Sequence, residues 1–449
     1  MKLSDPQKTV LFSEWRTEGR ELDMLLPVIY FLERREIACS YTPILDLWEV
    51  LRNVPDLAIL SGGIGCIESF QFSKLCHRSG IDLFTMITEG SFSPSQADSM
   101  LWGWNKDRIL YENSTFMWSE NSYDIVKEIY EGPKGKIKVS GSPGHDKYKI
   151  YKPLMRLDRM NFKKVIGIGG NAFEYLKAHS KEIIRVTSQQ YYDICASYEK
   201  ISNSIMKKLV KQNPDILFII KSHPADNLMV PLEVAGFENE HNLRIVHDDF
   251  PIFELIANSD FWLSFASSTT LEAWLMGKPC LSFGTRKEIL EHTYVSTGGL
   301  LSEDADQIQC YIDEYFSTGK IVDFENKADI RRRLAHDLIG FDDGLNHVRF
   351  LSFLRPLIEG APGQKGRWDL GWIEKAKLYV KHLRALAAKR KKTWPLLRQH
   401  AKIYEMFNLD KLNEIKKCRY PQLDAFYAEH SDRIEHLYRS YADEWNRSH

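Results

Sequence analysis

Two short polar segments in the second half of the chain carry residue types that bind phosphate or move a proton. Lys221 and His223 directly follow the apolar run 218–220, and Pro224 breaks the chain there. Ser267–Thr270 follows a second apolar run, 261–265, and precedes a helical pattern. A histidine so placed can hydrogen-bond a phosphate or protonate a leaving group, and a helix start with hydroxyls can hold an anion. Both segments therefore predict a phosphate-binding site.

Residues around these segments complete the predicted donor site. The Glu272 carboxylate could accept hydrogen bonds from a ribose diol; alternatively, Ser268 or Thr269 only caps the helix and Glu272 closes a capping box. Residues 167–170 (Gly-Ile-Gly-Gly) could let the backbone approach a phosphate, or serve only as a turn. They lack the spacing of dinucleotide-binding and Walker motifs. The predicted donor-binding set is Gly169, Gly170, Lys221, His223, Ser267, Ser268, Thr269 and Glu272.

The first half of the chain supplies candidates for the acceptor side. Glu89 follows the expected strand 81–87, where its carboxylate could deprotonate an acceptor hydroxyl or simply bind loop N–H groups. We therefore predict Glu89 and His223 as the catalytic residues. The acceptor-side candidates are Glu18, Arg20, Asp23 and Gly63, with Glu14 and Asp146 as weaker alternatives for the base. Asp146 is expected rather to order the interdomain linker. No DxD motif follows a strand, so we predict no metal and no cofactor.

Strand-like and helix-like segments alternate in both halves, which is typical of parallel βαβ units. We expect strands at 9–14, 36–41, 56–60, 81–87, 108–111, 136–139, 165–169, 215–221, 243–246, 261–265 and 279–283. Long helices are expected at 20–33 and 182–212. Ligands of parallel sheets bind at the carboxyl ends of the strands, where the candidates above lie. The turn at 141–144 and the polar stretch 147–164 mark a boundary, so we predict domains at 1–150 and 160–345 and a helical appendage at 366–449.

Composition argues against several classes of protein. The formal net charge of −1 gives no sign of a nucleic-acid binder. The seven cysteines form no CxxC pair and fit reduced thiols of a cytosolic protein better than zinc ligands or disulfides. The amino terminus has no signal-peptide pattern, so we expect a cytoplasmic protein.

The segment 361–402 is strongly basic. It contains twelve Lys or Arg residues against two acidic ones, an excess of ten positive charges. Together with aliphatic and aromatic residues such as Trp372 and Leu383, these charges predict contact with an anionic membrane surface or an anionic glycan. A solvated face on packed helices is the alternative. Membrane contact would place the chain at the inner face of the cell membrane.

The donor segments resemble a known group of enzymes. KSHPAD (221–226) and DFWLSFASSTTLEAWLMGKPCLSFG (260–284) are similar to the donor half of GT-B glycosyltransferases of bacterial surface carbohydrate biosynthesis, including the capsule Kdo-transferase and sialyltransferase-like group and the teichoic-acid polyol-phosphate transferases. In these families the His-Pro histidine and a Ser/Thr pair hold the donor phosphate, which corresponds to His223 and Ser267–Ser268. The resemblance covers about residues 9–345, although Thr88 and Ser142 depart from the motifs of the first half.

The resemblance implies an α/β, GT-B-like fold of two Rossmann-like domains facing a cleft, a donor-side second domain, and metal-independent catalysis. The implied function is transfer of a sugar from a nucleotide-activated donor, commonly CMP-linked, to a glycan or lipid-linked glycan such as capsule or lipopolysaccharide. One alternative is a polyol-phosphate or sugar-phosphate transferase with a CDP-linked donor. Another is a non-catalytic partner that binds a nucleotide sugar or glycan, which the departures at Thr88 and Ser142 favour.

Overall fold

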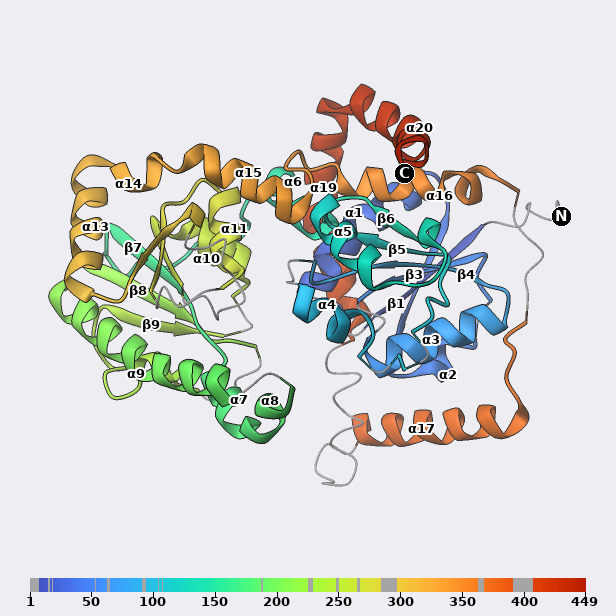
Figure 1. The fold of residues 1–449 in the computed structure, drawn as a ribbon, viewed down its shortest axis with the longest axis horizontal. Coiled ribbons are helices and arrows are strands. Elements are labelled where there is room, and N and C mark those ends of the chain that lie inside the picture. The colour runs from blue at the N-terminus through green and yellow to red at the C-terminus, as the bar shows by residue number, and fades with distance from the viewer. Residues whose placement is uncertain are drawn as a thin grey trace. The chain divides into compact units, whose positions relative to one another are not determined.

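The chain folds into two compact units, each built around its own parallel sheet (Figure 1). One unit comprises Met1–Tyr151 and His336–His449, and the other comprises Lys152–Ala335. The computed structural model describes residues 8–14, 17, 19–52, 54–62, 65–90, 94–103, 105–106, 108–186, 189–224, 229–247, 250–264, 267–283, 297–361, 367–390 and 407–449.

The sheet of the first unit has six parallel strands in the order β2-β1-β3-β4-β5-β6. The strands are β1 (Thr9–Glu14), β2 (Ala38–Pro43), β3 (Leu57–Ser61), β4 (Asp82–Met86), β5 (Ser114–Met117) and β6 (Ile137–Val139). The helices of the first 151 residues are α1 (Arg20–Glu33), α2 (Leu47–Val50), α3 (Ile67–Arg78), α4 (Pro94–Leu101), α5 (Glu120–Ile129) and α6 (Lys147–Ile150), with 3₁₀ turns η1 (Lys134–Lys136) and η2 (Pro143–His145). Apolar residues dominate β1, β3 and β4, because a central parallel strand is covered on both faces.

The C-terminal helices belong to this first unit. They are α16 (Asn346–Glu359), α17 (Trp372–Arg390), α19 (Leu409–Glu429) and α20 (Ser431–Ser448). The ring of Phe350 on α16 lies 4.7 Å from that of Phe116 on β5, edge to face. Burial of such aromatic pairs stabilises the unit beyond the area that they remove from water.

The second unit has the strand order β12-β11-β10-β7-β8-β9, again all parallel. Its strands are β7 (Lys164–Gly169), β8 (Ile216–Lys221), β9 (Leu243–Val246), β10 (Phe261–Ser264), β11 (Cys280–Phe283) and β12 (Leu300–Ser302). Its helices are α7 (Phe173–Ala178), α8 (Ser180–Val186), α9 (Gln189–Gln212), α10 (Ile252–Asn258), α11 (Thr269–Leu275), α13 (Ala305–Thr318) and α14 (Val322–Glu325), with η3 (Leu232–Val234); α15 (Ala328–Ile339) leads into the first unit. The central strands β7, β8 and β10 form the middle of the core.

The predicted α/β class with two Rossmann-like sheets is confirmed, and β1 and α1 have the expected bounds. The strand expected at 108–111 is wrong, because Arg108 adopts φ 52°, in the left-handed region that a strand cannot use. The strand lies instead at β5, and neither β5 nor β12 was expected. The helix expected at 182–212 is described as two helices, α8 and α9.

The compact units also group the chain differently from the predicted segments. Contacts place 336–345 and the helices after residue 366 with the first unit, whereas the sequence analysis assigned them to the second domain and to a separate appendage. Trp368 shows why, since its side chain is buried in the core beside β3 and α3. The donor and acceptor roles of the two units stay predictions.

Candidate functional site

The predicted donor residues of the second unit follow three neighbouring strands. In the sheet, β7 lies between β10 and β8, so that Gly169 at its end is opposite both Ser264 and Lys221. The segments that leave these three strands, starting at Gly170, Ser222 and beyond Ser264, therefore share the carboxyl edge of one sheet. His223, Ser267, Ser268 and Thr269 are each partly exposed there. This edge is where ligands bind in open parallel sheets.

The two glycines at the end of β7 are required by close packing. The Gly170 N–H donates to the Lys221 carbonyl at 2.9 Å. A Cβ at position 170 would lie 2.5 Å from that carbonyl oxygen, and one at Gly169 would lie 2.8 Å from Oγ1 of Thr269. The next two N–H groups are also engaged, with the Glu233 and Asn171 side chains. These backbone donors thus serve the loop itself, so a bound phosphate would depend mainly on side chains.

The hydroxyl segment before α11 is internally hydrogen-bonded. Oγ of Ser267 accepts from the Thr269 N–H at 3.3 Å and from Oγ1 of Thr269 at 3.2 Å. The side chain of Ser268, which is the N-cap residue, makes no capping hydrogen bond to the helix. Ser267 therefore holds the turn, while Ser268 is partly exposed and its side chain does not cap the helix. The alternative in which Ser268 serves only as a side-chain cap is not what the structure shows.

Lys221 and Glu272 are the two charged residues of the predicted donor set. The ammonium of Lys221 donates to the His247 carbonyl at 2.7 Å, which directs it toward the end of β9, on the side of β8 away from β7. Glu272 lies in the first turn of α11 and is only 5% exposed. Both residues belong to the edge; Glu272 is buried, whereas Lys221 is partly exposed like His223, Ser267 and Ser268.

In the first unit, the structure brings together two residues that the sequence analysis assigned to different roles. Nη1 of Arg20, the first residue of α1, lies 2.9 Å from Oε1 of Glu89, which follows β4. Asp23, one turn further along α1, pairs with Lys147 at 2.7 Å. The predicted residues Glu18 and Gly63 lie outside the described residues. Arg20, Asp23 and Glu89 thus form ion pairs at or near the carboxyl edge of the first sheet.

Two buried titratable groups lie near this edge. The sequence analysis named Glu14 only as a weaker candidate for the base, and it did not name His145. Burial raises the pKa of Glu14 well above its ordinary value, although the Ser61 hydroxyl and N–H both donate to its carboxylate. Burial lowers the pKa of His145 well below its ordinary value, and the charges of Lys147 and Arg20 lower it further. Nδ1 of His145 lies 2.7 Å from Oγ of Ser142. The sequence analysis gave no role to His145, which follows the turn 141–144.

Burial changes the chemistry of two of the cysteines, Cys76 and Cys280. All seven are free of disulfides. Burial raises the pKa of Cys280 to about 12, which keeps its sulfur protonated near neutral pH. Burial also raises the pKa of the Cys76 thiol. These two thiols are therefore poor nucleophiles, and the reduced state of the seven cysteines stays a prediction.

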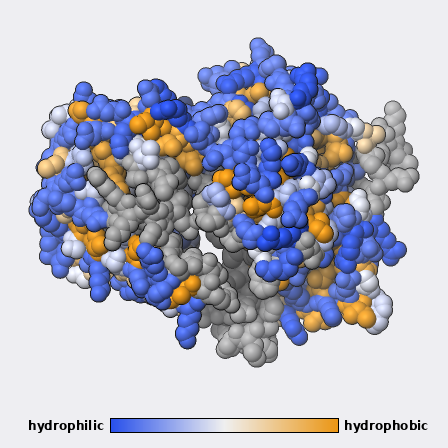
Figure 2. Space-filling view, viewed as in Figure 1, coloured by the Kyte–Doolittle hydropathy of each residue, from blue (hydrophilic) through white to orange (hydrophobic). Residues whose placement is uncertain are grey.

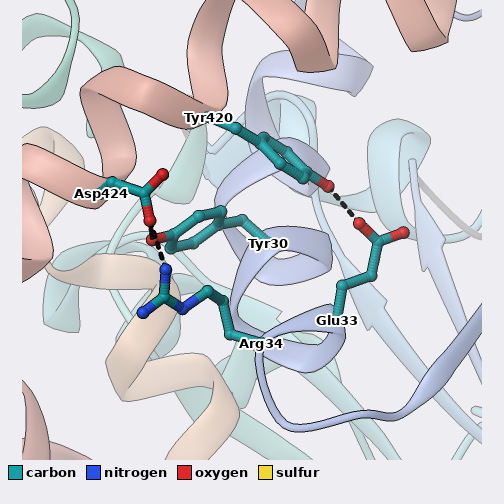
Figure 3. A pocket seen from close by; sticks show the side chains of 5 residues that line it. All are labelled: Tyr30, Glu33, Arg34, Tyr420 and Asp424. Carbon is teal, nitrogen blue, oxygen red and sulfur yellow. Dashed lines mark hydrogen bonds and ion pairs between the residues drawn. The ribbon is translucent and has the colours of Figure 1, made fainter.

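Figure 3 shows a small pocket between α1 and α19, within the first unit. Its polar side chains already bind one another. Tyr30 donates to Asp424 at 2.7 Å, Arg34 pairs with the same carboxylate, and Tyr420 donates to Glu33. Because these pairs join the two helices, the pocket is better explained as part of the packing contact between α1 and α19 than as a ligand site.

Comparison with known proteins agrees with the architecture. Residues 156–287 match the family model described as capsule polysaccharide biosynthesis protein. A putative UDP-N-acetylglucosamine 2-epimerase from Listeria monocytogenes aligns over 81% of this chain and 100% of its own, at 13% identity and a TM-score of 0.53. A UDP-GlcNAc 2-epimerase from Neisseria meningitidis bound to UDP-GlcNAc aligns over 78% and 100%, at 17% identity and a TM-score of 0.50. No curated protein sequence matched the chain.

The structural similarities show a GT-B-like α/β fold, and the family-model match supports a role in carbohydrate biosynthesis. The matched residues 156–287 contain the whole predicted donor set. Within the part of the chain that the structure describes, no helix combines the length and apolar character needed to cross a bilayer.

Proposed function

We propose that the chain is a glycosyltransferase that moves a sugar from a nucleotide-activated donor, CMP-linked by the resemblance of its donor segments, to a surface polysaccharide or glycolipid acceptor. The observation that carries the proposal is the convergence of His223, Ser267 and Ser268 on one edge of the second sheet. These side chains follow β8 and β10, the two strands on either side of β7, and are partly exposed, as a phosphate site requires.

In this proposal the donor phosphate binds at that edge. The hydroxyl of Ser268 and a ring nitrogen of His223 would donate to the phosphate oxygens, and Ser267 would keep the turn in place through its bonds to Thr269. As the bond between the anomeric carbon and the phosphate oxygen breaks, the nucleotide leaves with the electron pair. Hydrogen-bond donors that point at the developing negative charge stabilise the transition state of this step more than its ground state.

Glu89 is proposed as the base on the acceptor side. Its carboxylate is 65% exposed, so a hydroxyl can reach it. On transfer, the acceptor hydroxyl would give its proton to Glu89 while its oxygen forms the new bond to the anomeric carbon. Arg20, 2.9 Å from this carboxylate, would orient it.

Nucleotide binding by matched variants tests the donor site. We expect His223→Ala and Ser268→Ala each to weaken binding of cytidine nucleotides at least tenfold, since each removes a hydrogen bond to a charged group, at about 1.5–3 kcal/mol. His241→Ala is the control, because His241 precedes β9 at the amino end of the same sheet. Ser204→Ala on α9 controls for loss of an exposed hydroxyl. Equal binding by all four variants would refute the assignment.

Product analysis then identifies the chemistry. A donor panel should include CMP-, CDP- and UDP-linked compounds, since the Neisseria relative of similar fold was solved with UDP-GlcNAc. A glycosidic product supports the proposal. A phosphodiester product would instead identify a polyol-phosphate or sugar-phosphate transferase, and tight binding without turnover would identify a non-catalytic partner.

A further inference from the structure

Helix α17 is attached to the first unit along one side. The segment before it is anchored by Trp368, whose side chain is 4% exposed in the core, and by the Asp369 N–H, which donates to Oγ of Ser79 at 2.9 Å. Further along, Ala385 is fully buried. The helix therefore has a defined inner face and orientation.

His382 holds the middle of this inner face. Its Nδ1 lies 2.7 Å from Oδ2 of Asp46, and its Nε2 lies 3.5 Å from Oε1 of Glu49. One ligand atom from each of Asp46, Glu49 and His382 lies within 4.8 Å of the others, and in the structure the imidazole is paired with both carboxylates. At the border between the inner and outer sides, the half-exposed ring of Tyr379 lies 4.9 Å from the ring of Trp48. This group is accordingly a clamp between α17 and α2.

The outer side of α17 carries large apolar side chains in water. Successive members lie one, three or six positions apart, and at 100° per residue they fall on one continuous stripe. Exposed fractions are Trp372 79%, Ile373 51%, Tyr379 45%, Val380 46%, Leu383 44% and Leu386 38%. Figure 2 shows orange apolar atoms beside blue hydrophilic ones at the place of this helix, at the lower right of the view. A row of this extent on one short helix needs a partner.

Basic side chains border the stripe. Lys377, Lys381 and Arg384 are exposed, and their spacing of four and three residues places them in one row next to Ile373 and Val380. Glu374 is the only acidic residue within Trp372–Arg390. A polar face of lysine and arginine along an apolar stripe is the pattern of helices that lie in the plane of an anionic bilayer.

We propose that α17 binds the surface of an anionic lipid bilayer, with its apolar stripe among the upper acyl chains and the Lys377–Arg384 row at the headgroups. The long stems of these basic side chains can reach the headgroups while the stripe is buried. An anionic glycan would pair with the charges but would leave Leu383 and Val380 in water. This inference is independent of the proposed chemistry, because it concerns a surface on the first unit and needs no donor.

Vesicle co-sedimentation of the full chain tests the proposal. We expect binding to phosphatidylcholine vesicles that contain phosphatidylglycerol, and little binding to phosphatidylcholine alone. Replacing Lys377, Lys381 and Arg384 together by Gln should lower the partition coefficient about a hundredfold, from roughly fivefold for each charge. Leu383→Ser should lower it about tenfold through lost apolar burial. Trp372→Phe should retain binding but lose a component of fluorescence quenching by brominated lipid.

Matched controls lie on the second unit. One control replaces Lys181, Lys200 and Lys207 together by Gln, which removes the same amount of charge. The other, Met229→Ser, removes an apolar side chain that is 75% exposed. Both variants should bind vesicles as the unaltered chain does. Circular dichroism verifies folding of each variant. Equal binding of α17 and control variants would overturn the proposal. The proposal would also be overturned if Leu383→Ser abolished self-association of the chain while leaving vesicle binding unchanged. A soluble anionic polysaccharide that binds equally to Leu383→Ser and the unaltered chain, with no vesicle binding, would also overturn it.

Discussion

The carboxylate of Asp146 accepts a 2.8 Å hydrogen bond from Nδ1 of His347, which lies 201 positions later, and both side chains are fully buried. The same carboxylate accepts from the backbone N–H groups of Asn346 and His347 at 3.1 and 2.9 Å. These are the first two residues of α16, whose N–H groups have no partner within the helix. Nε2 of His347 in turn contacts the Tyr427 hydroxyl at 2.7 Å. Asp146 thereby joins the turn after β6 to α16 and α19.

The first prediction concerns this buried group. Asp146→Ala should lower the free energy of unfolding by about 3–5 kcal/mol, because it leaves His347 and two N–H groups without their acceptor. Denaturant titration followed by circular dichroism measures the change. Glu128→Ala, an exposed carboxylate on α5, should change stability by less than about 0.5 kcal/mol. Similar effects of the two changes would show that the Asp146 contacts contribute little.

The second prediction concerns the close approach at the end of β7. Gly170→Ala would place a methyl group 2.5 Å from the Lys221 carbonyl oxygen. The resulting shift should destabilise the fold by about 1–3 kcal/mol and weaken nucleotide binding. Gly135→Ala is the matched control, since a Cβ there meets nothing within 4 Å. Thermal unfolding and nucleotide titration provide the two readouts, and unchanged values for Gly170→Ala would contradict the packing argument.

The third prediction is a pH dependence due to Glu14. Burial raises its folded pKa above the ordinary value of 4.5, so the folded protein binds a proton that the unfolded chain releases. Stability should therefore fall as pH rises from about 4.5 toward the folded pKa. Glu14→Gln keeps partners for Ser61 but does not ionise. The stability of the unaltered chain relative to this variant should be highest near pH 4 and decrease toward pH 8, as measured by denaturant titration. A relative stability that rises over this interval would contradict a protonated buried Glu14.

The fourth prediction separates catalysis from structure at Glu89. The Arg20–Glu89 pair is 36% and 65% exposed, so breaking it should cost at most about 1 kcal/mol of stability. Glu89→Gln should nevertheless reduce turnover at least about a hundredfold, with donor affinity unchanged, because a base is lost. Glu435→Gln, which removes an exposed carboxylate paired with Arg439, is the control. Normal turnover in Glu89→Gln would exclude this residue as the base.

The sequence by itself determined the alternation of strands and helices and the places where polar residues leave the strands. The apolar run in β8 and the hydroxyls after β10 are local patterns, and local backbone and burial preferences are enough to interpret them. Parallel pairing then puts their carboxyl ends on one edge, as expected for Lys221 and Gly169. The weak strand β5 was missed because only four residues, two of them polar, carry its pattern.

Tertiary structure alone decided which distant groups meet. Asp146 and His347 are 201 positions apart, and Arg20 and Glu89 are 69 apart, so no periodicity relates them. The need for glycine at position 170 is explained by the Lys221 carbonyl, 51 positions later. The inner face of α17 is explained by Asp46, which contacts His382 from 336 positions earlier. Such contacts depend on how whole elements pack, because side-chain partners are chosen by position in space. Local sequence preferences act only over a few neighbouring residues.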